Sequence, residues 1–380
     1  AGLPQAPNSY DPYANADQAK ERRDLVLYSM KENGKITKEQ YDQAVATPVT
    51  DDLIAHDNNV NSNDKALVYD SFVTMVLKEV QEKTGLDPYN DGLTIETTID
   101  SKAQQRLYDI VNTNDYIQYV NEKIQNAVVM LDTKTGAVRA VNGGRKQTTL
   151  LGYNRATDNT RSTGSTIKPV IDYGPAIEYL NYSTGQTIMD QRTTYSNGVE
   201  LNNWDFSHKG AMTLRTALVY SRNTTALQTF KAVGETNIKS FLNNLDIQIK
   251  NDGQDYLVES NSIGADISPI KMAAAYATFG NYGTYSKPYT VRKVTTRDGQ
   301  VTEFKPEQKQ AMKDSTAYMI TDVLKDSFKY GFATQAAIPG LPTAAKTGSS
   351  NYTAEQKRAM GASDYEDIIP DSWFIGYSTD

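Results

Sequence analysis

The sequence of 380 residues contains no cysteine and only two histidines, His56 and His208. Without cysteine the chain has no disulfide framework, no thiolate nucleophile and no sulfur ligand for a metal. Both histidines stand in polar, loop-like surroundings, so a multi-histidine metal site or a Ser-His-Asp triad is a poor explanation for any activity. We therefore expect no metal and no cofactor.

Long apolar runs and an excess of positive charge are also missing. No stretch approaches the ~18 apolar residues of a membrane-spanning helix, and no signal peptide opens the chain. The formal net charge of −7 argues against nucleic acid or an anionic membrane surface as a partner. Because the chain begins without methionine, inside what reads as a folded unit, we expect it to be a fragment of a longer protein.

Composition divides the chain into three parts. Residues 1–60 contain a loop, two short helices and a polar linker, which we interpret as the end of a preceding domain. Residues 61–125 combine helical patterns with one alternating strand and predict a small α+β linker module. Residues 126–380 begin with a hairpin, continue with helices and end with two strands.

The third part predicts an α+β fold with a central antiparallel sheet flanked by helices, because strands stand at both of its ends. The expected strands are 127–131, 137–141, 289–295, 301–304, 343–349 and 372–377. The expected helices are 213–220, 224–233, 267–279 and 315–329, besides one that begins near Ser165.

The stretch 161–174 places Ser165 three residues before Lys168. If a helix begins near Ser165, the two side chains share one face, with Cβ atoms roughly 5–6 Å apart. Ser165 then stands at the helix N-terminus, where unpaired N–H groups favour developing negative charge. Pro169 fits the first turn, and the apolar residues that follow predict burial. A desolvated, neutral lysine amine can take the proton of a serine hydroxyl and so activate it as a nucleophile.

Ser-x-x-Lys spacing alone is not specific, because it also occurs at Ser62 and Ser268. Ser62 lies in a polar run that reads as a loop leading into a helix. Ser268 precedes Pro269 and an alanine-rich segment, so a helix N-cap with proline at the first helical position explains it. Ser165 therefore needs further residues to support a catalytic role.

Two later motifs provide them, Ser221-Arg-Asn223 and Lys346-Thr-Gly348. They follow Ser165 at separations of 56 and then 125 positions, on an inter-helix loop and on a strand. Lys-Thr-Gly also occurs at Lys83 and Lys134, where a helix end and a hairpin turn explain it. In this order and spacing, the three motifs resemble those of serine penicillin-recognising enzymes, the β-lactamases and penicillin-binding proteins.

The resemblance extends along nearly the whole chain to the bimodular, class A penicillin-binding proteins. Segments 1–12 and 19–27 are similar to the end of that family's glycosyltransferase domain. Segments 154–156, 165–169 and 269–288 are similar to its transpeptidase domain. The glycosyltransferase carboxylates are absent, so we expect no glycan polymerisation, and we expect a further strand and helix beyond Asp380.

The resemblance implies a D,D-transpeptidase that cross-links peptidoglycan stem peptides ending in D-Ala-D-Ala and is trapped by β-lactam antibiotics. It also implies a membrane-anchored protein at the extracytoplasmic face of the bacterial cell membrane, associated with cell-wall synthesis proteins. Ser165 is then the nucleophile and Lys168 its base. Because the pKa of free lysine is about 10.4, keeping that amine neutral near pH 7 costs about 4 kcal/mol.

The remaining motif residues take roles by the same resemblance. Ser221 relays a proton, and Asn223 orients Lys168 or the substrate. The catalytic amine Lys346 and the substrate-binding Thr347, Gly348 and Ser349 form the strand that binds the terminal carboxylate. The backbone N–H groups of Ser165 and Ser349 are similar to the family's oxyanion hole.

Two alternatives stay open at this point. A serine β-lactamase needs a base for deacylation, such as a glutamate with an asparagine four residues on. The glutamates between the second and third motifs lack that asparagine; they are Glu235, Glu259, Glu303 and Glu307. A non-catalytic β-lactam sensor or scaffold is the second alternative. Steady release of D-Ala would distinguish an enzyme from a sensor, and rapid turnover of penicillin would favour a β-lactamase.

Overall fold

The computed structural model describes residues 10–13, 15–51, 53, 60–352, 354–361, 363 and 368–378. The chain divides into two compact units, Ala1–Ala66 and Leu67–Asp380, which we describe separately. His56 lies outside the described residues. Among the helices within them, none is long and apolar enough to cross a membrane.

The first unit contains two helices, α1 (Ala16–Glu32) and α2 (Lys38–Ala46), as the sequence predicts. Gly34 lies between them in the left-handed region, with φ of +66°. At the start of α2, the backbone N–H of Gln40 donates to Thr37 Oγ1 at 3.2 Å and the N–H of Thr37 donates to Gln40 Oε1 at 2.8 Å. Such a reciprocal capping box is typical of the Thr-x-x-Gln pattern at a helix start.

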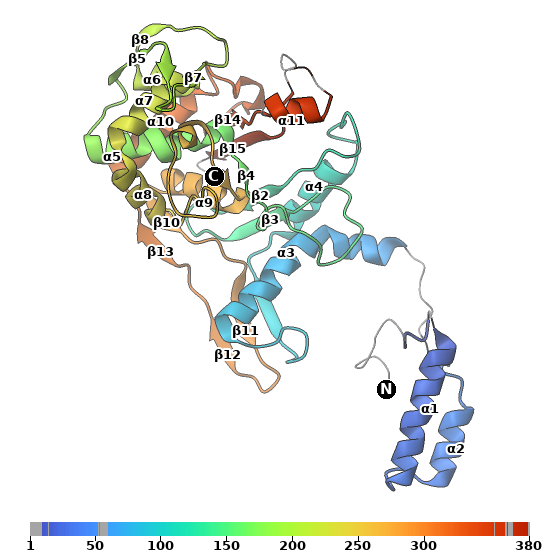
Figure 1. Cartoon of the computed structure of the whole chain (residues 1–380). Coiled ribbons are helices and arrows are strands. Elements are labelled where there is room, and N and C mark those ends of the chain that lie inside the picture. Colours follow the sequence, from blue (N-terminus) through green and yellow to red (C-terminus); the bar gives the residue numbers. More distant parts are fainter. Residues whose placement is uncertain are drawn as a thin grey trace. The chain divides into compact units, whose positions relative to one another are not determined.

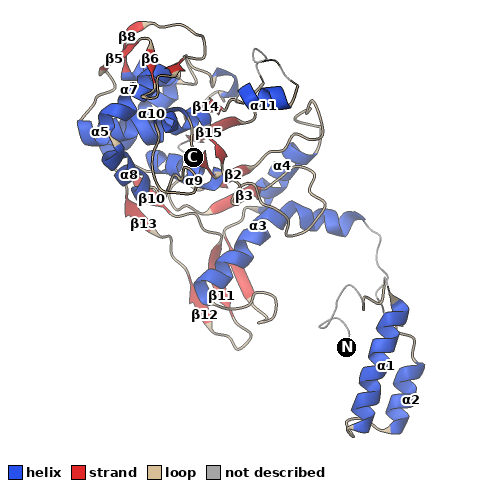
Figure 2. Cartoon of the chain, viewed as in Figure 1, coloured by secondary structure: helices blue, strands red, loops and turns tan. Residues whose placement is uncertain are grey.

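Helix α3 (Val60–Thr84) leads into the second unit, in which groups of helices and groups of strands follow one another along the chain (Figures 1 and 2). The other α-helices are α4 (Ser101–Asn112), α5 (Gly174–Leu180), α6 (Leu214–Val219), α7 (Asn223–Val233), α8 (Glu235–Asn244), α9 (Pro269–Gly280), α10 (Asp314–Asp326) and α11 (Ala354–Ala359). Short 3₁₀ or π turns are η1 (Gly164–Ile167), η2 (Pro169–Tyr173), η3 (Glu259–Ile263) and η4 (Thr334–Ala336).

All the strand pairs in the described ladders are antiparallel. One sheet has the order β1 (Thr94–Thr97), β11 (Val291–Thr295), β12 (Val301–Glu303). The paired strands are β2 (Val128–Leu131) with β3 (Val138–Asn142), β4 (Arg161–Ser162) with β9 (Asp266–Ile267), β5 (Thr187–Asp190) with β8 (Gly210–Thr213), β6 (Thr193–Thr194) with β7 (Glu200–Leu201), β10 (Thr284–Ser286) with β13 (Gln308–Gln310), and β14 (Thr343–Ser349) with β15 (Ser372–Ser378).

The α+β fold is confirmed, with one difference in the expected central sheet. Within the described residues, β14 and β15 pair with each other, and β2 and β3 form a separate pair. Helix α9 bridges the two pairs by contacting both β15 and β2, while α10 packs on β14 (Figure 1). The β14–β15 and β2–β3 pairs are therefore connected through helix α9, and not by the continuous hydrogen bonding of one central sheet.

The residues predicted as a linker module pack closely on the third part of the chain. Strand β1 pairs along β11, nearly 200 positions later in the sequence. The side-chain amide of Gln104 on α4 donates to the carbonyls of Val68 and Val141, at 2.7 and 2.9 Å. A second core beneath α3 includes Phe72, Val138 and other side chains from both segments. The boundaries drawn at residues 60 and 125 stay predictions.

Several local expectations differ from the structure. Ser62 lies inside α3 rather than in a loop, so its predicted setting was wrong. Ser268 does stand at the N-cap of α9 before Pro269, but its side chain makes no capping hydrogen bond. The sequence analysis also missed α8, although Ile238, Phe241 and Leu242 have helical spacing, and it missed the β5–β8 pair, whose strands are only four residues long.

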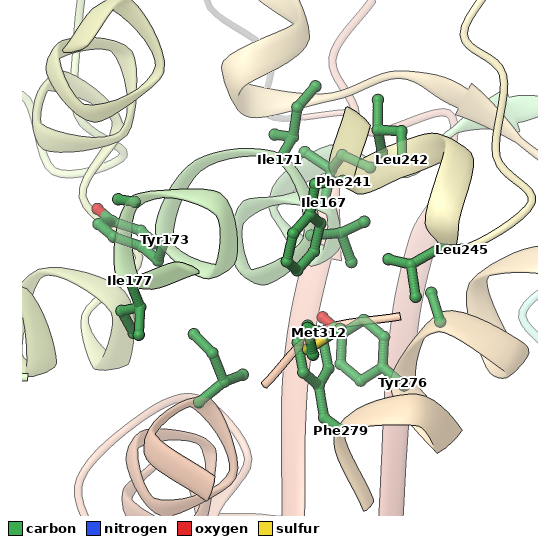
Figure 3. Packing of buried hydrophobic residues seen from close by; sticks show 14 of the residues in the cluster. Ile167, Ile171, Tyr173, Ile177, Phe241, Leu242, Leu245, Tyr276, Phe279 and Met312 are labelled. Atoms are coloured by element: carbon green, nitrogen blue, oxygen red, sulfur yellow. The ribbon is translucent and has the colours of Figure 1, made fainter. Parts of the chain in front are cut away.

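The main core lies directly beneath the predicted active-site turn. Ile167 and Ile171 are fully buried, and burial of such side chains contributes roughly 1.5–3 kcal/mol each. Figure 3 shows Ile167 against Phe241 of α8 and near Tyr276 of α9. The hydroxyl of Tyr276 also donates a hydrogen bond of 2.6 Å to the carbonyl of Thr166. The turn that carries Ser165 is therefore held from below by two helices.

Candidate active site

The segment that carries Ser165 is helical but not a regular α-helix, so the expected single helix was wrong in detail. It begins as the 3₁₀ turn η1, continues as the π-helix η2 and becomes α-helical only in α5. Pro169 and Pro175 each remove an N–H donor from the usual i→i−4 ladder, which accounts for the irregularity. The N–H of Lys168 instead bonds the carbonyl of Ser165, one 3₁₀ turn before it.

Two glycines allow the Ser165 turn and strand β14 to approach closely. A Cβ at Gly164 would stand 2.2 Å from the carbonyl oxygen of Ser349. A Cβ at Gly348 would stand 2.6 Å from the carbonyl oxygen of Thr163. No other residue fits at these positions without moving the backbone. The third motif is therefore packed against the first by direct backbone contact.

The amine of Lys168 is completely buried and held by the second motif. Its Nζ lies 2.7 Å from Asn223 Oδ1 and 2.8 Å from the carbonyl oxygen of Ser221, with longer contacts of 3.3 Å to Ser221 Oγ and the carbonyl of Arg222. Burial holds the pKa of Lys168 well below its ordinary value, and the charge of Lys346 lowers that pKa further. Such an amine is available as a base near neutral pH.

Ser221 Oγ lies between two buried amines. Lys346 Nζ donates to it at 2.9 Å, and Lys168 Nζ lies 3.3 Å from it. Burial lowers the pKa of Lys346 to about 7. A hydroxyl in this position can receive a proton from one amine and pass another on.

Asn223 has its amide orientation fixed by a second contact. Its Nδ2 donates to the carbonyl of Asn202 at 2.8 Å, so its Oδ1 faces Lys168. Asn223 is the first residue of α7, and Ser221 precedes it in the left-handed region with φ of +53°. The expected loop between α6 and α7 is thus a tight, strained connection.

The residues predicted to bind substrate line the end of β14. Lys346 is buried, Thr347 and Gly348 are half-buried, and Ser349 is exposed, so the strand runs from the core to the surface. Thr347 and Ser349 alternate with Gly348 and therefore share one face of the strand. Ser165 is half-buried, and its hydroxyl makes no hydrogen bond within the described part of the chain. Hydrogen bonds thus link Asn223, Lys168, Ser221 and Lys346 in that order, and among the described residues the Ser165 hydroxyl has no partner.

Asp172 is one buried residue that the sequence analysis did not identify. It is fully buried four residues after Lys168, and neither carboxylate oxygen has a hydrogen-bond partner among the residues that the structure describes. Burial raises its pKa well above the ordinary value, although the nearby charge of Lys168 works in the opposite direction. Its position within an apolar helical run was the sequence signal that could have predicted a buried aspartate.

Residues 126–380 match the model of the penicillin binding protein transpeptidase domain. The chain belongs to this family. Among curated relatives, it is 41% identical to penicillin-binding protein 1A/1B of Bacillus subtilis and 40% identical to penicillin-binding protein 1A of Streptococcus oralis. Each match covers 100% of this chain but 41% and 60% of the relative, so the chain spans about half of their length.

Solved penicillin-binding proteins share the fold. The structure of PonA1 from Mycobacterium tuberculosis superposes with a TM-score of 0.69 at 23% identity and covers 83% of this chain and 81% of its own. Penicillin-binding protein 1A of Haemophilus influenzae gives 0.64 at 18% identity and covers 99% of this chain and 72% of its own. PonA1 has also been solved in complex with penicillin V.

Proposed function

We propose that this penicillin-binding protein segment is a serine D,D-transpeptidase that acts through an acyl-enzyme on Ser165. The observation that carries the proposal is the hydroxyl of Ser221 between the buried amines of Lys168 and Lys346. The substrate class is a peptidoglycan stem peptide that ends in D-Ala-D-Ala. The full-length protein would be membrane-anchored at the extracytoplasmic face and work with other cell-wall synthesis proteins.

The acylation step begins with transfer of the Ser165 proton to Lys168. A neutral amine has two N–H donors, and its two shortest contacts are to Asn223 Oδ1 and the carbonyl of Ser221. The nitrogen lone pair then remains available for the Ser165 proton. Ser165 Oγ attacks the carbonyl of the penultimate D-Ala, and the negative charge on that oxygen is stabilised by the backbone N–H groups of Ser165 and Ser349.

Collapse of the tetrahedral intermediate breaks the D-Ala–D-Ala amide bond. The departing nitrogen receives a proton relayed from Lys168 through Ser221, and terminal D-Ala leaves as the free amino acid. An amine of a second stem peptide then attacks the Ser165 ester and gives its proton back through the same amines. The products are the cross-link and the free Ser165 hydroxyl.

Strand β14 supplies the recognition of the terminal carboxylate. Lys346 in its protonated form, with the hydroxyls of Thr347 and Ser349, would bind that group by charge-assisted hydrogen bonds. A β-lactam carries a carboxylate in a comparable position, and its leaving group stays attached to the acyl-enzyme. We therefore expect β-lactams to acylate Ser165 and to remain bound.

The β-lactamase alternative receives no support from the positions of the four candidate glutamates. Glu259 pairs with Lys231 at 3.0 Å, and Glu235 pairs with Lys239 at 2.9 Å. Glu303 and Glu307 are exposed. None of the four makes a hydrogen bond to the described motif residues, so none of these glutamates is positioned as a base for deacylation.

Intact-mass spectrometry after incubation with penicillin tests the proposal. We expect one adduct on the parent protein and none on Ser165→Ala, with Ser62→Ala and Ser268→Ala as matched controls that are labelled like the parent. Labelling that is lost with Ser62 or Ser268 would refute the assignment. Release of D-Ala from a D-Ala-D-Ala peptide then distinguishes the transpeptidase from a sensor, which would release none beyond the first turnover.

A further inference from the structure

The second motif is held in a strained conformation. Ser221 is not a glycine, yet its φ is +53°, a conformation that costs of order 1–3 kcal/mol and persists only when the surroundings enforce it. Its backbone N–H donates to the carbonyl of Leu218 at 3.1 Å, and its carbonyl accepts a hydrogen bond from Lys168 Nζ at 2.8 Å, so only the first of these is independent of the catalytic amine. Other groups must therefore fix the direction in which Ser221 and Asn223 present their side chains.

Arg222, between those two residues, is the first of these groups. Its guanidinium is almost completely buried, and its Nε donates to Asp190 Oδ2 on β5 at 2.9 Å. Its Nη1 lies 3.0 Å from both carboxylate oxygens of Asp205. A planar guanidinium paired with two carboxylates can occupy essentially one orientation.

The second group is the segment 202–209 between β7 and β8, which we call the anchor loop. The carbonyl of Asn202 accepts the amide of Asn223, and Asn203 Oδ1 accepts the backbone N–H of Asn223 at 2.7 Å. Asn203 Nδ2 donates in turn to Asp190 Oδ1 at 2.8 Å. The anchor loop thus touches the catalytic asparagine at both its side chain and its backbone.

The two groups are joined at Asp205 and Ser207 of the anchor loop, because the Asp205 carboxylate and the Ser207 carbonyl both accept hydrogen bonds from the Arg222 guanidinium. Nearby, Trp204 Nε1 donates to the carbonyl of Tyr220 at 3.1 Å, immediately before Ser221. Removing the Arg222–Asp205 pair would take away the charged contact between the anchor loop and the second motif and leave only hydrogen bonds to neutral groups of the loop.

We propose that Asp205 and Arg222 are positioning residues that lock the anchor loop onto the second motif and thereby aim Ser221 and Asn223 at Lys168. Neither side chain contacts the reacting atoms. The inference rests on the proposed function, because what it positions is the hydroxyl and amide that this function uses. Small displacements of such groups can cost up to about 100-fold in rate.

The test compares Asp205→Asn and Arg222→Lys with the parent protein. Glu200→Gln is the matched control, because Glu200 forms an exposed bidentate pair with Arg192 on the adjoining β6–β7 hairpin and makes no hydrogen bond to a motif residue in the described part of the chain. Acylation by penicillin is measured by stopped-flow, which separates the limiting rate from the non-covalent dissociation constant, and the adduct stoichiometry is measured by mass spectrometry.

We expect the limiting rate to fall about tenfold or more in Asp205→Asn and Arg222→Lys, with the dissociation constant and the stoichiometry retained. Glu200→Gln should behave as the parent. A lower stoichiometry with an unchanged rate would mean that the pair serves folding alone and would overturn the inference, as would parent-like rates in both variants.

A second measurement does not depend on acylation. Hydrogen exchange of peptides covering residues 202–224 should be faster in Asp205→Asn than in the parent and unchanged in Glu200→Gln. Equal exchange in all three proteins would overturn the inference. If the parent itself forms no adduct, the proposed function fails, and the exchange comparison still decides whether Asp205 orders the second motif.

Discussion

Lys168 Nζ and Asn223 Oδ1 lie 2.7 Å apart, although the residues are 55 positions apart in the sequence. Since Nδ2 of the same amide is bound to Asn202, the oxygen cannot turn away from the amine without losing a second bond. The neutral lysine therefore meets an uncharged acceptor. This pair leads to the first prediction.

Asn223→Asp should raise the pKa of Lys168, because a carboxylate beside the amine favours the ammonium form. The acid limb of the penicillin acylation rate should move to higher pH, and the rate at pH 7 should fall about tenfold or more. Asn237→Asp on α8 is the control, since Asn237 bonds only the carbonyl of Val233 in the described structure. If the acylation rate of Asn223→Asp fell at the same acidic pH as that of the parent, the role of Lys168 as the base would be contradicted.

The pH dependence of peptide cleavage should be bell-shaped. Lys168 must be neutral, and burial lowers its pKa, so kcat/KM rises with pH through that depressed pKa. Lys346 must be protonated to bind the carboxylate, and its pKa is about 7, so kcat/KM falls as pH rises through about 7. With a substrate analogue that ends in a carboxamide, which has no carboxylate for Lys346 to bind, kcat/KM should not fall as the pH rises through about 7. Persistence of that fall with the carboxamide would show that Lys346 does not bind the carboxylate as an ammonium group.

Gly348→Ala should separate β14 from the Ser165 turn. The added methyl would lie 2.6 Å from the carbonyl oxygen of Thr163 and 2.8 Å from the N–H nitrogen of Thr166, so backbone must shift. We expect a loss of about 1–3 kcal/mol in the free energy of unfolding, and a larger relative loss in acylation rate. Gly185→Ala is the control, because its nearest neighbour would be a side-chain atom at 3.7 Å. Denaturant unfolding and penicillin labelling of both variants measure the two effects.

Asp172→Asn should change how stability depends on pH. Burial raises the pKa of Asp172 in the folded protein, so the folded state holds its proton more tightly than the unfolded state. This contribution to stability is complete below the ordinary pKa of about 3.9 and is lost as pH rises toward the folded pKa, by about 1.4 kcal/mol per pH unit.

The asparagine variant carries no such titration. Its free energy of unfolding relative to the parent should therefore increase between pH 5 and pH 7, measured by urea unfolding at each pH. Taking the difference between the two proteins removes the contribution of Lys346, which has the opposite slope because burial lowers its pKa. A constant difference across this range would contradict a buried, unpaired Asp172.

Most elements of the fold could be predicted because their signals are local. The capping box at Thr37, the glycine turn at Gly136 and the strand Thr343–Ser349 follow from residues within a few positions of one another. The β5–β8 pair could not be predicted, because its strands are only four residues long and pack against α6 and α7. The 3₁₀ and π geometry around Ser165 was missed because Pro169 reads equally well as an ordinary first-turn proline.

The sequence by itself determined which chemical groups are present and in what order: a serine and lysine three residues apart, a distant serine and asparagine, and a second lysine on a strand. Only the tertiary structure decided that Ser221 lies between two amines and that Arg222 and Asp205 hold it there. The physical reason is desolvation. Whether a lysine is a base or a surface cation depends on burial by segments far away in the chain, and no local pattern records that burial.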